Sequence, residues 1–544
     1  MPVAEGPIFR KVGSDATMEP TWGLVNTRPF ESFPCYSYRL NAHMITPLFA
    51  NRWLISLPPI WLVGMGALTA SLILIALWGL LRMIAPRAAA EAKASLHDGF
   101  LGPLAWLLLA ASGTAIALTP LVPVWGISQS LGRLLTVNTS STIVTIEPGS
   151  ESKKIELPLR PQELETISFS TDQPIMIRTQ KPIEGFALLK VPDIDLDQQS
   201  QWSWEKSAGK PNPFLGKNAQ IEATNLNDKK GAAAASLTIN WRLVPEFPEV
   251  AILPITTATL LLIVLLYTLF RLSIRRVAAV VSATMKEAIG QPIFSVAIIA
   301  GIVLLLTFIV IPYNTFGEDV KMLKDSGLTL VKILALLVVI WTASVTVSDE
   351  IEGRTALTVL SKPLTRRQFV VGKFIGLSLV ALLIFMILGA VLMSTTSLKV
   401  VYDARESSKT APLWADCATE MVTVVPGLVL SLLETILLAA VSLAVSTRVG
   451  MIPNLIICFT IYVLGHLVPL IVQSSVGKLA IVRFVGRLFA TLLPVLEHFT
   501  IEAAVIGGVP VPWGYLAWAA VYAGLYSAIA LLIALVLFQN RDLA

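Results

Sequence analysis

A dense group of charged residues between positions 347 and 373 stands between two long apolar segments. Three acids come first, a short apolar turn follows at 355–360, and Ser361-Lys362-Pro363 then precedes a basic pair. A short helix flanked by fixed charges can dock in a groove of a partner protein, where apolar anchors rather than rim charges supply most of the binding energy. The residues that we expect to take part in such docking are Asp349, Glu350, Glu352, Arg354, Leu357, Leu360, Pro363, Arg366, Arg367 and Lys373.

A simpler interpretation of this segment is a cytoplasmic loop whose arginines contact lipid phosphates, because Lys and Arg in short loops mark the cytoplasmic side of a membrane protein. That interpretation explains the basic pair. It does not explain the preceding acids or the Ser-Lys-Pro break.

Three further ionisable residues lie inside apolar segments. A carboxylate in hydrocarbon costs about 2.5 kcal/mol or more, so Glu434 either lines a pathway or is held neutral by a hydrogen bond to a neighbouring helix. His466 either contributes to the same pathway or packs near a kink at Pro469. Lys332 is expected to extend its ammonium group to the outer interface.

No catalytic motif accompanies these residues. The Gly-Lys pairs are followed by Pro, Asn, Phe and Leu, so the sequence has no phosphate-binding P-loop with which to hydrolyse ATP. Its four histidines are scattered, and it has no serine-hydrolase or zinc-protease motif. We therefore expect no enzymatic site, no metal site and no cofactor on this chain. The absence of basic runs interleaved with aromatic residues also argues against nucleic acid as a partner.

The composition is that of a polytopic α-helical membrane protein. The hydrophobic fraction is 55%, the charged fraction is 14% and the mean hydropathy is +0.72, values that exclude an ordinary soluble globule. Uncharged apolar runs of about 20 residues suffice to span a bilayer. We predict nine spans, at 54–81, 101–130, 250–270, 293–313, 327–347, 374–394, 422–447, 451–473 and 513–538.

Residues 132–248 have a different pattern, because their apolar runs are short and alternate with polar residues. Such alternation indicates half-buried strands, and we expect an inserted β-sandwich-like domain of six to eight strands with a turn at 227–231. Trp202 and Trp204 are placed in its longest loop, 198–217, where they pack in the domain or form a ligand platform. The clearest strands are at 142–146, 166–170, 174–178 and 237–241.

The segment 272–290 is expected to be an amphipathic interfacial helix. At 100° per residue, its apolar residues fall on one face and its charged residues on the other, so it would lie along the inner leaflet with basic residues at the headgroups. The apolar face comprises Ile274, Val277, Val281, Met285 and Ala288. The remaining divisions that we predict are a tail at 1–53, two spans with a short loop at 54–131, a third span at 249–271 and a six-span core at 291–544.

Several ordered motifs together resemble the ABC-2 type transporter permeases, over about residues 284–544. They are the loop at 347–373, Met285-Lys-Glu-Ala-Ile-Gly-Gln-Pro292, the segments 493–499 and 508–516 before the last span, and the ending Phe538-Gln-Asn-Arg-Asp-Leu543. The resemblance implies a coupling loop at 348–373 that docks a separate ATP-binding subunit, which would hold ATP and Mg²⁺. It also implies a second permease copy or paralogue as a partner.

The expected location is the bacterial cytoplasmic (inner) membrane, with 348–373 and the C-terminus in the cytoplasm and 132–248 outside, where an envelope partner could bind the β-domain. Parity places the first 53 residues outside as well, unless 54–81 is re-entrant or a misread hairpin. The function that we expect is that of a permease, most of which export. The alternatives are a mechanotransmission or envelope-assembly component that moves no solute, and a non-ABC membrane scaffold that presents the β-domain.

Overall fold

The computed structural model describes residues 53–539. It leaves out 87–88, 91–98, 135–138, 148–151, 179–192, 199, 207–211, 215–218, 227–233, 314–317, 353–364, 410, 474–480, 482–483, 487, 490–492, 501–503 and 505–510, and the side chains of 347–352 and 468–473. The predicted N-terminal tail and the turn at 227–231 therefore lie outside the described residues.

Eight helical segments of the described chain are long and apolar enough to cross a membrane. Many of their large apolar side chains are exposed, including Leu109, Leu262, Val303 and Leu525, as expected where lipid rather than water is the solvent. The chain is therefore a polytopic helical membrane protein. The spanning helices are α1 (Leu57–Ile84), α3 (Leu101–Leu118), α5 (Ile252–Ser273), α7 (Pro292–Val310), α8 (Asp319–Glu352), α10 (Arg366–Glu406), α12 (Val425–Ser446) and α16 (Trp513–Gln539).

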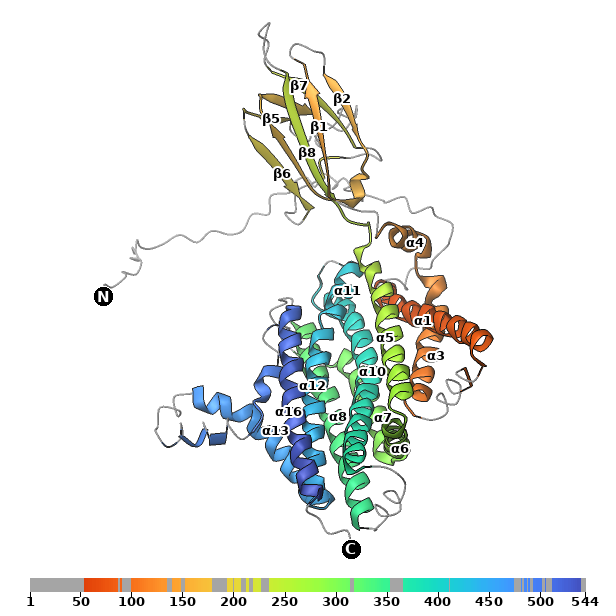
Figure 1. The fold of residues 1–544 in the computed structure, drawn as a ribbon. Coiled ribbons are helices and arrows are strands. Elements are labelled where there is room, and N and C mark those ends of the chain that lie inside the picture. Colours follow the sequence, from red (N-terminus) through yellow and green to blue (C-terminus); the bar gives the residue numbers. More distant parts are fainter. Residues whose placement is uncertain are drawn as a thin grey trace, which may run out of the picture. The chain divides into compact units, whose positions relative to one another are not determined.

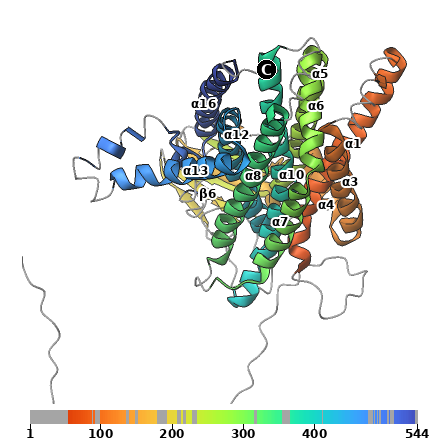
Figure 2. The same ribbon diagram turned by 90° about the horizontal axis from the view of Figure 1, so that it is seen from below.

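The ninth predicted span falls on α13 (Met451–Gln473), whose side chains are described only as far as Leu467. Its described apolar part, Met451–Leu467, is shorter than a span. Eight helices of the described chain are thus long and apolar enough to span a membrane, and the count of nine spans remains a prediction. Within this core, α8, α10, α12 and α16 lie side by side (Figures 1 and 2).

One predicted span is broken by proline. The segment 101–130 divides into α3, the single turn η2 (Thr119–Leu121) and the amphipathic helix α4 (Val124–Arg133), because Pro120 and Pro123 cannot supply backbone N–H groups to continue α3. The predicted span 422–447 corresponds to α12, which the short helix α11 (Trp414–Val422) precedes and which has Pro426 in its first turn. Proline is accommodated there because the first-turn N–H groups have no partner within the helix.

Two other helices extend well beyond their apolar windows. α8 begins at Asp319 and α10 continues to Glu406, both outside the predicted spans 327–347 and 374–394. α10 begins with a capping box, in which the Thr365 hydroxyl accepts from the Gln368 N–H and the Gln368 side chain accepts from the Thr365 N–H. Ion pairs with other parts of the chain compensate several charges of these polar extensions, among them Asp319, Lys324 and Lys399.

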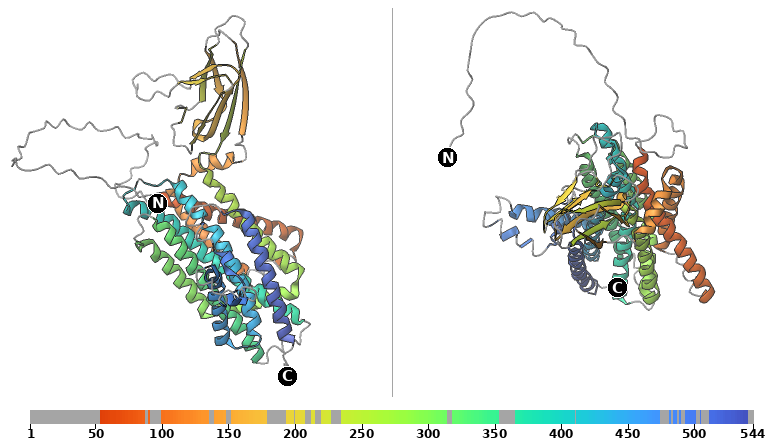
Figure 3. Two further views of the ribbon diagram at one scale, coloured as in Figure 1. Left: turned by 90° about the vertical axis from the view of Figure 1, so that its left-hand side faces the viewer. Right: turned by 90° about the horizontal axis from the view of Figure 1, so that it is seen from above.

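Between α4 and α5 in the sequence lie eight strands in two four-stranded antiparallel sheets, ordered β1-β8-β3-β6 and β2-β7-β4-β5. The strands are the arrows in Figure 3. Alternate residues of each inner face form the core; in β8, for example, Leu237, Ile239 and Trp241 are buried. The strands are β1 (Thr139–Ile146), β2 (Lys153–Leu157), β3 (Leu164–Thr171), β4 (Ile175–Arg178), β5 (Ile194–Leu196), β6 (Gln201–Glu205), β7 (Ala219–Asn225) and β8 (Ala235–Leu243).

The prediction that Trp202 and Trp204 lie in a long loop is wrong, because both are on strand β6. Trp204 is buried in the sandwich core, and Trp202 stacks on Phe169 of the neighbouring strand with ring centroids 5.4 Å apart. Polar residues lie between and beside the two tryptophans, so the short sequence around them does not show a clear strand pattern. The tryptophan pair therefore packs within the domain.

The amphipathic helix α6 (Arg275–Gly290) buries most of the predicted apolar face, namely Val277, Val281, Met285 and Ala288. Ile274 is exposed because it precedes the helix, with a non-helical backbone at φ −127° and ψ 63°. α6 packs against α10, so protein covers part of the surface of this helix.

Candidate functional site

Three ionisable side chains from three helices meet inside the core, and we call Lys332, Glu434 and His466 the buried charge cluster. Glu434 is on α12, and its side chain is 0% exposed. Its Oε2 lies 3.3 Å from Nζ of Lys332 on α8, and its Oε1 lies 2.8 Å from Nε2 of His466 on α13. The carboxylate thus has a nitrogen partner on each oxygen.

Tyr462 completes the cluster on the side of α13. Nζ of Lys332 lies 5.6 Å from the centre of the Tyr462 ring, and the His466 ring meets that ring edge-on with centroids 4.8 Å apart. Because residues four apart lie on the same helix face, Tyr462 and His466 are presented together. The aromatic ring favours a cation at this position.

The prediction that Lys332 extends to the outer interface is wrong, since its side chain is only 8% exposed and contacts Glu434. A lysine reaches the interface when no anion is available inside. Here the buried carboxylate compensates the ammonium charge, and each group would be costly in the core without the other. Sequence reasoning singled out Glu434 and His466 separately, but it did not show that the two residues touch each other or Lys332.

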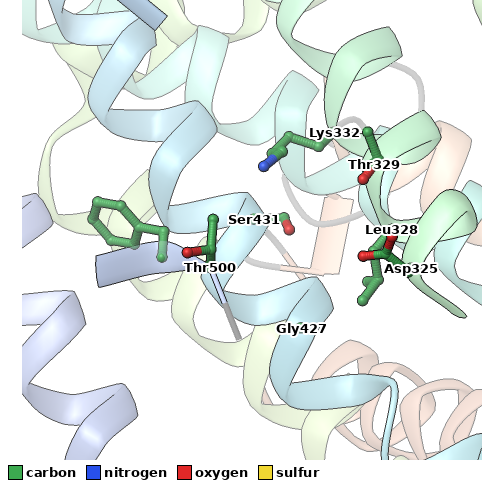
Figure 4. Close-up of a pocket in the computed structure, with 8 residues that line it drawn as sticks. Asp325, Leu328, Thr329, Lys332, Gly427, Ser431 and Thr500 are labelled. Carbon is green, nitrogen blue, oxygen red and sulfur yellow. The ribbon is translucent and has the colours of Figure 1, made fainter. Parts of the chain in front are cut away.

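A small pocket adjoins the cluster. Asp325, Thr329 and Lys332 of α8 line one side of it, and Ser431 of α12 and Thr500 contribute hydroxyl groups from two others (Figure 4). The pocket has room for about one water molecule. Since Asp325, Thr329 and Lys332 are spaced by four and three residues, they form one polar stripe on α8 that leads to the buried carboxylate.

The predicted coupling residues are only partly described. Asp349, Glu350 and Glu352 lie in the last turns of α8, with side chains outside the described part of the chain. Arg366, Arg367 and Lys373 lie on α10. The remaining four predicted residues fall in the segment that the structure does not describe, namely Arg354, Leu357, Leu360 and Pro363.

Arg366 contacts the end of α16. Its guanidinium donates to the carbonyl oxygen of Gln539 at 3.1 Å and lies 5.8 Å from the Phe538 ring centre. A cation beside the last carbonyls of a helix is favourable because it satisfies groups that have no partner within the helix. Arg367, by contrast, is exposed, so it is the basic residue of the pair that is more accessible to a partner.

Lys373 does not form part of an exposed docking surface as we predicted, because its side chain is 3% exposed. Its Nζ lies 3.5 Å from Glu287 Oε2 on α6 and donates to the Thr346 carbonyl of α8 at 3.3 Å. The long stem of lysine lets its ammonium group reach these partners although its Cα faces the helix interface. Lys373 therefore joins α6, α8 and α10.

Two glycines bring α6 against α10. A Cβ atom at Gly372 would lie 2.7 Å from Cβ of Val280, and one at Gly376 would lie 2.8 Å from Cβ of Thr284. Glycines four residues apart on one face let two helix backbones approach closely in a membrane protein. Together with Lys373, they fix α6 to the start of α10.

Two more buried lysines form ion pairs between helices near the other end of the core, one with a buried aspartate and one with a half-exposed glutamate. Lys399 of α10 is fully buried, with Nζ 3.3 Å from Asp319 Oδ2 of α8, and Lys324 of α8 is paired with Glu420 of α11. In each pair the two residues come from different helices, so every charge is compensated across a helix interface. No local sequence signal identifies these partners.

The described residues include no group of three or more His, Cys, Asp or Glu side chains that could hold a metal ion. No protein-family model matches the chain, and a search of curated proteins finds no significant match. Fold and site together define a polytopic helical membrane protein with a buried charge cluster.

Proposed function

We propose that the chain is the membrane-spanning permease subunit of an ABC-2 type transporter, an exporter driven by a separate ATP-binding subunit that docks on residues 348–373. The proposal includes nine spans, a second permease copy or paralogue, and the bacterial inner membrane with 348–373 and the C-terminus inside. It also places the β-domain outside, in reach of an envelope partner. The sequence motifs of residues 284–544 support it.

The observation that carries the proposal is the continuity of α8. One uninterrupted helix, Asp319–Glu352, contains Glu350 of the docking segment near one end and Lys332 of the buried charge cluster near its middle. At 1.5 Å per residue, these positions are about 27 Å apart along a rigid element. A displacement imposed on the docking segment would therefore reach the cluster without an intervening joint.

The packing of α6 and α10 supports the same mechanism. Gly372, Gly376 and the contacts of Lys373 fix α6 and α8 to the first turns of α10. Because these turns directly follow the docking segment in the sequence, α6, α8 and α10 would move as one body when a partner pushes on that segment.

Purification in mild detergent, followed by mass spectrometry and an ATPase assay, tests the proposal. We expect a stoichiometric partner with a P-loop lysine, and we expect its loss in Glu350→Lys and Leu357→Ala. Glu318→Lys is the matched control, because Glu318 is exposed near the opposite end of α8, and this variant should retain the partner. A preparation without nucleotide hydrolysis and without such a partner would refute the permease proposal.

A second candidate is a mechanotransmission component that uses the same partner but moves no solute. The small size of the pocket beside the cluster favours it. An uptake or efflux assay on the partner-bound complex distinguishes the two, since only a permease changes the solute distribution when ATP is added.

A further inference from the structure

The exposed side of α4 begins with an apolar patch at the end of the helix that follows α3. This α4 patch comprises Leu121 of the preceding turn η2 together with Val124 and Trp125 of α4, all exposed, and Trp125 is exposed to 78%. The opposite side of the helix packs into a buried core cluster through Ile127. Protein therefore covers one face of α4, while the α4 patch faces away from the chain.

The length of α3 places α4 at the edge of the hydrocarbon. The 18 residues of α3 extend about 27 Å, close to the bilayer core of about 30 Å, and its side chains Leu109 and Ile116 are exposed as in a lipid-facing helix. The helix then ends at Pro120 and Pro123. Backbone that leaves the helix is costly inside hydrocarbon, so this break belongs at the membrane boundary, where α4 begins.

The contact of α4 with the start of α5 leads to the same position. α4 packs against the single turn η6 (Pro248–Ala251), and a Cβ atom at Gly126 would lie 3.2 Å from the ring of Phe247, which directly precedes that turn. α5 follows η6 at once, and its Ile255 is already exposed. Since Ile255 is four residues beyond η6, the apolar outer surface of α5 begins about 6 Å along the helix from the contact with α4.

The chemistry of the exposed side of α4 changes along the helix. After the α4 patch come Ser128, Gln129 and Gly132, which are exposed and carry no charge. The Ser128 hydroxyl donates to the Trp125 carbonyl at 2.9 Å, so its polar group is satisfied within the helix. Tryptophan, with a large apolar ring and a single N–H donor, is enriched at the boundary between lipid chains and headgroups.

The other end of α4 is joined to the β-domain. Arg133, in the last turn of α4, lies 2.6 Å from Oε1 of Glu163 in the turn η3 (Pro161–Glu163), and the Glu163 side chain is 5% exposed. The carbonyl oxygen of Glu163 accepts from the N–H of Val244, just after β8. One residue of the β-domain thus connects α4 with the segment that leads back to the membrane, so α4 has an apolar end and an end fixed to the domain.

We propose that the α4 patch is a lipid-contact site, inserted at the boundary between the acyl chains and the headgroups of a phospholipid layer. Because Arg133 and Glu163 join α4 to the β-domain, the insertion holds the base of that domain at the membrane surface. Zwitterionic phospholipid suffices, since Arg133 is the only basic residue of α4 and is already paired. The proposal does not rest on the permease function.

Spin labelling of the full chain in phosphatidylcholine nanodiscs tests the proposal. The chain has three cysteines; Cys417 and Cys458 are buried, and Cys35→Ser removes the third. Trp125→Cys then carries a nitroxide in the α4 patch, and Leu121→Cys gives a second label that keeps the tryptophan. Power-saturation EPR compares collisions with O₂, which concentrates in lipid, and with a water-soluble nickel chelate.

Two exposed isoleucines serve as references, Ile116→Cys on the lipid-facing side of α3 and Ile143→Cys on strand β1. We expect the labels at Leu121 and Trp125 to lie about 5–10 Å inside the lipid surface, with collision ratios between those of the two references. Adding anionic lipid should leave this depth unchanged, and a depth that requires anionic lipid would overturn the assignment to zwitterionic phospholipid.

Two other results would overturn the lipid contact itself. Labels at Leu121 and Trp125 that meet the nickel chelate as often as the label at Ile143 would show that water covers the α4 patch. Labels shielded from both reagents would show that protein covers it, whether a second copy or another chain. Either result leaves the partner-binding experiment on residues 348–373 unaffected, because that experiment measures a different part of the chain.

Discussion

Replacing Lys399 with methionine should destabilise the helical core more than any exposed lysine replacement. Nζ of Lys399 lies 3.3 Å from Asp319 Oδ2 and donates to the carbonyl oxygens of Ile309 and Ile311 at 3.2 and 3.0 Å. Methionine fills most of the same volume but supplies no donor. The change therefore isolates the electrostatic contribution of one buried cation.

The expected loss in the free energy of unfolding depends on the carboxylate that Lys399→Met leaves behind. Asp319 has a side chain that is 8% exposed, so Lys399→Met leaves a buried carboxylate without its cation, and removal of one partner of a buried pair costs about 3–5 kcal/mol. Lys399→Met combined with Asp319→Asn removes both charges. Its loss should be smaller than the sum of the single losses by at least about 1 kcal/mol, since coupled neighbours are not additive.

Reversible unfolding in mixed detergent micelles, with SDS as the denaturant, measures these free energies. Lys321→Met is the matched control, because Lys321 pairs with Glu318 at 2.9 Å but is 37% exposed, and an exposed pair contributes about 1 kcal/mol or less. If Lys399→Met costs no more than Lys321→Met, or if the single losses simply add in the double variant, the reasoning about this buried pair is wrong.

Three further predictions concern other contacts of the described chain. Gly376→Val should cost about 1–3 kcal/mol in the same unfolding assay, because its side chain would meet Thr284, whereas Gly524→Val should cost little, since nothing lies within 4 Å of a Cβ at Gly524. Arg366→Gln should speed proteolysis at the end of α16 by removing the cation beside Gln539, while Arg367→Gln, at an exposed position, should not. Burial raises the pKa of the Glu163 carboxyl above 4.5 and outweighs the lowering effect of Arg133 and Arg160. The pKa of Glu163 is therefore higher in the folded than in the unfolded protein. The stability that this carboxyl contributes is fully present below pH 4.5 and is lost as the pH rises through the folded pKa. Thermal unfolding from pH 4 to 7 should show this slope, and Glu163→Gln should flatten it.

The sequence allowed the membrane-spanning helices and the strand-rich insertion to be predicted because both depend on short-range periodicity. Helix ends were less predictable. α8 begins at Asp319 and α10 continues to Glu406, and a hydropathy criterion leaves such polar residues out of a predicted span. The sequence predicted a single span over 101–130, and the separate amphipathic helix α4 after Pro120 was not anticipated.

The candidate site was predictable only as separate residues. Glu434 and His466 stand out because ionisable groups in hydrocarbon are costly, but the contact between them joins two helices, and that of Glu434 with Lys332 joins a third. The predicted position of Lys332 at the outer interface was wrong for the same reason, because the sequence around this lysine does not contain its partner Glu434. The same applies to Lys373, whose partners Glu287 and Thr346 lie on two other helices.

The length of α10 sets how the protein sits in lipid. Its 41 residues extend about 60 Å at 1.5 Å per residue, whereas the hydrocarbon core of a bilayer is about 30 Å thick. The helix therefore passes through both headgroup layers, with Arg366 and Arg367 at one end and Arg405 and Glu406 at the other. A thicker or thinner bilayer therefore immerses more or fewer of its turns without exposing an unpaired backbone end.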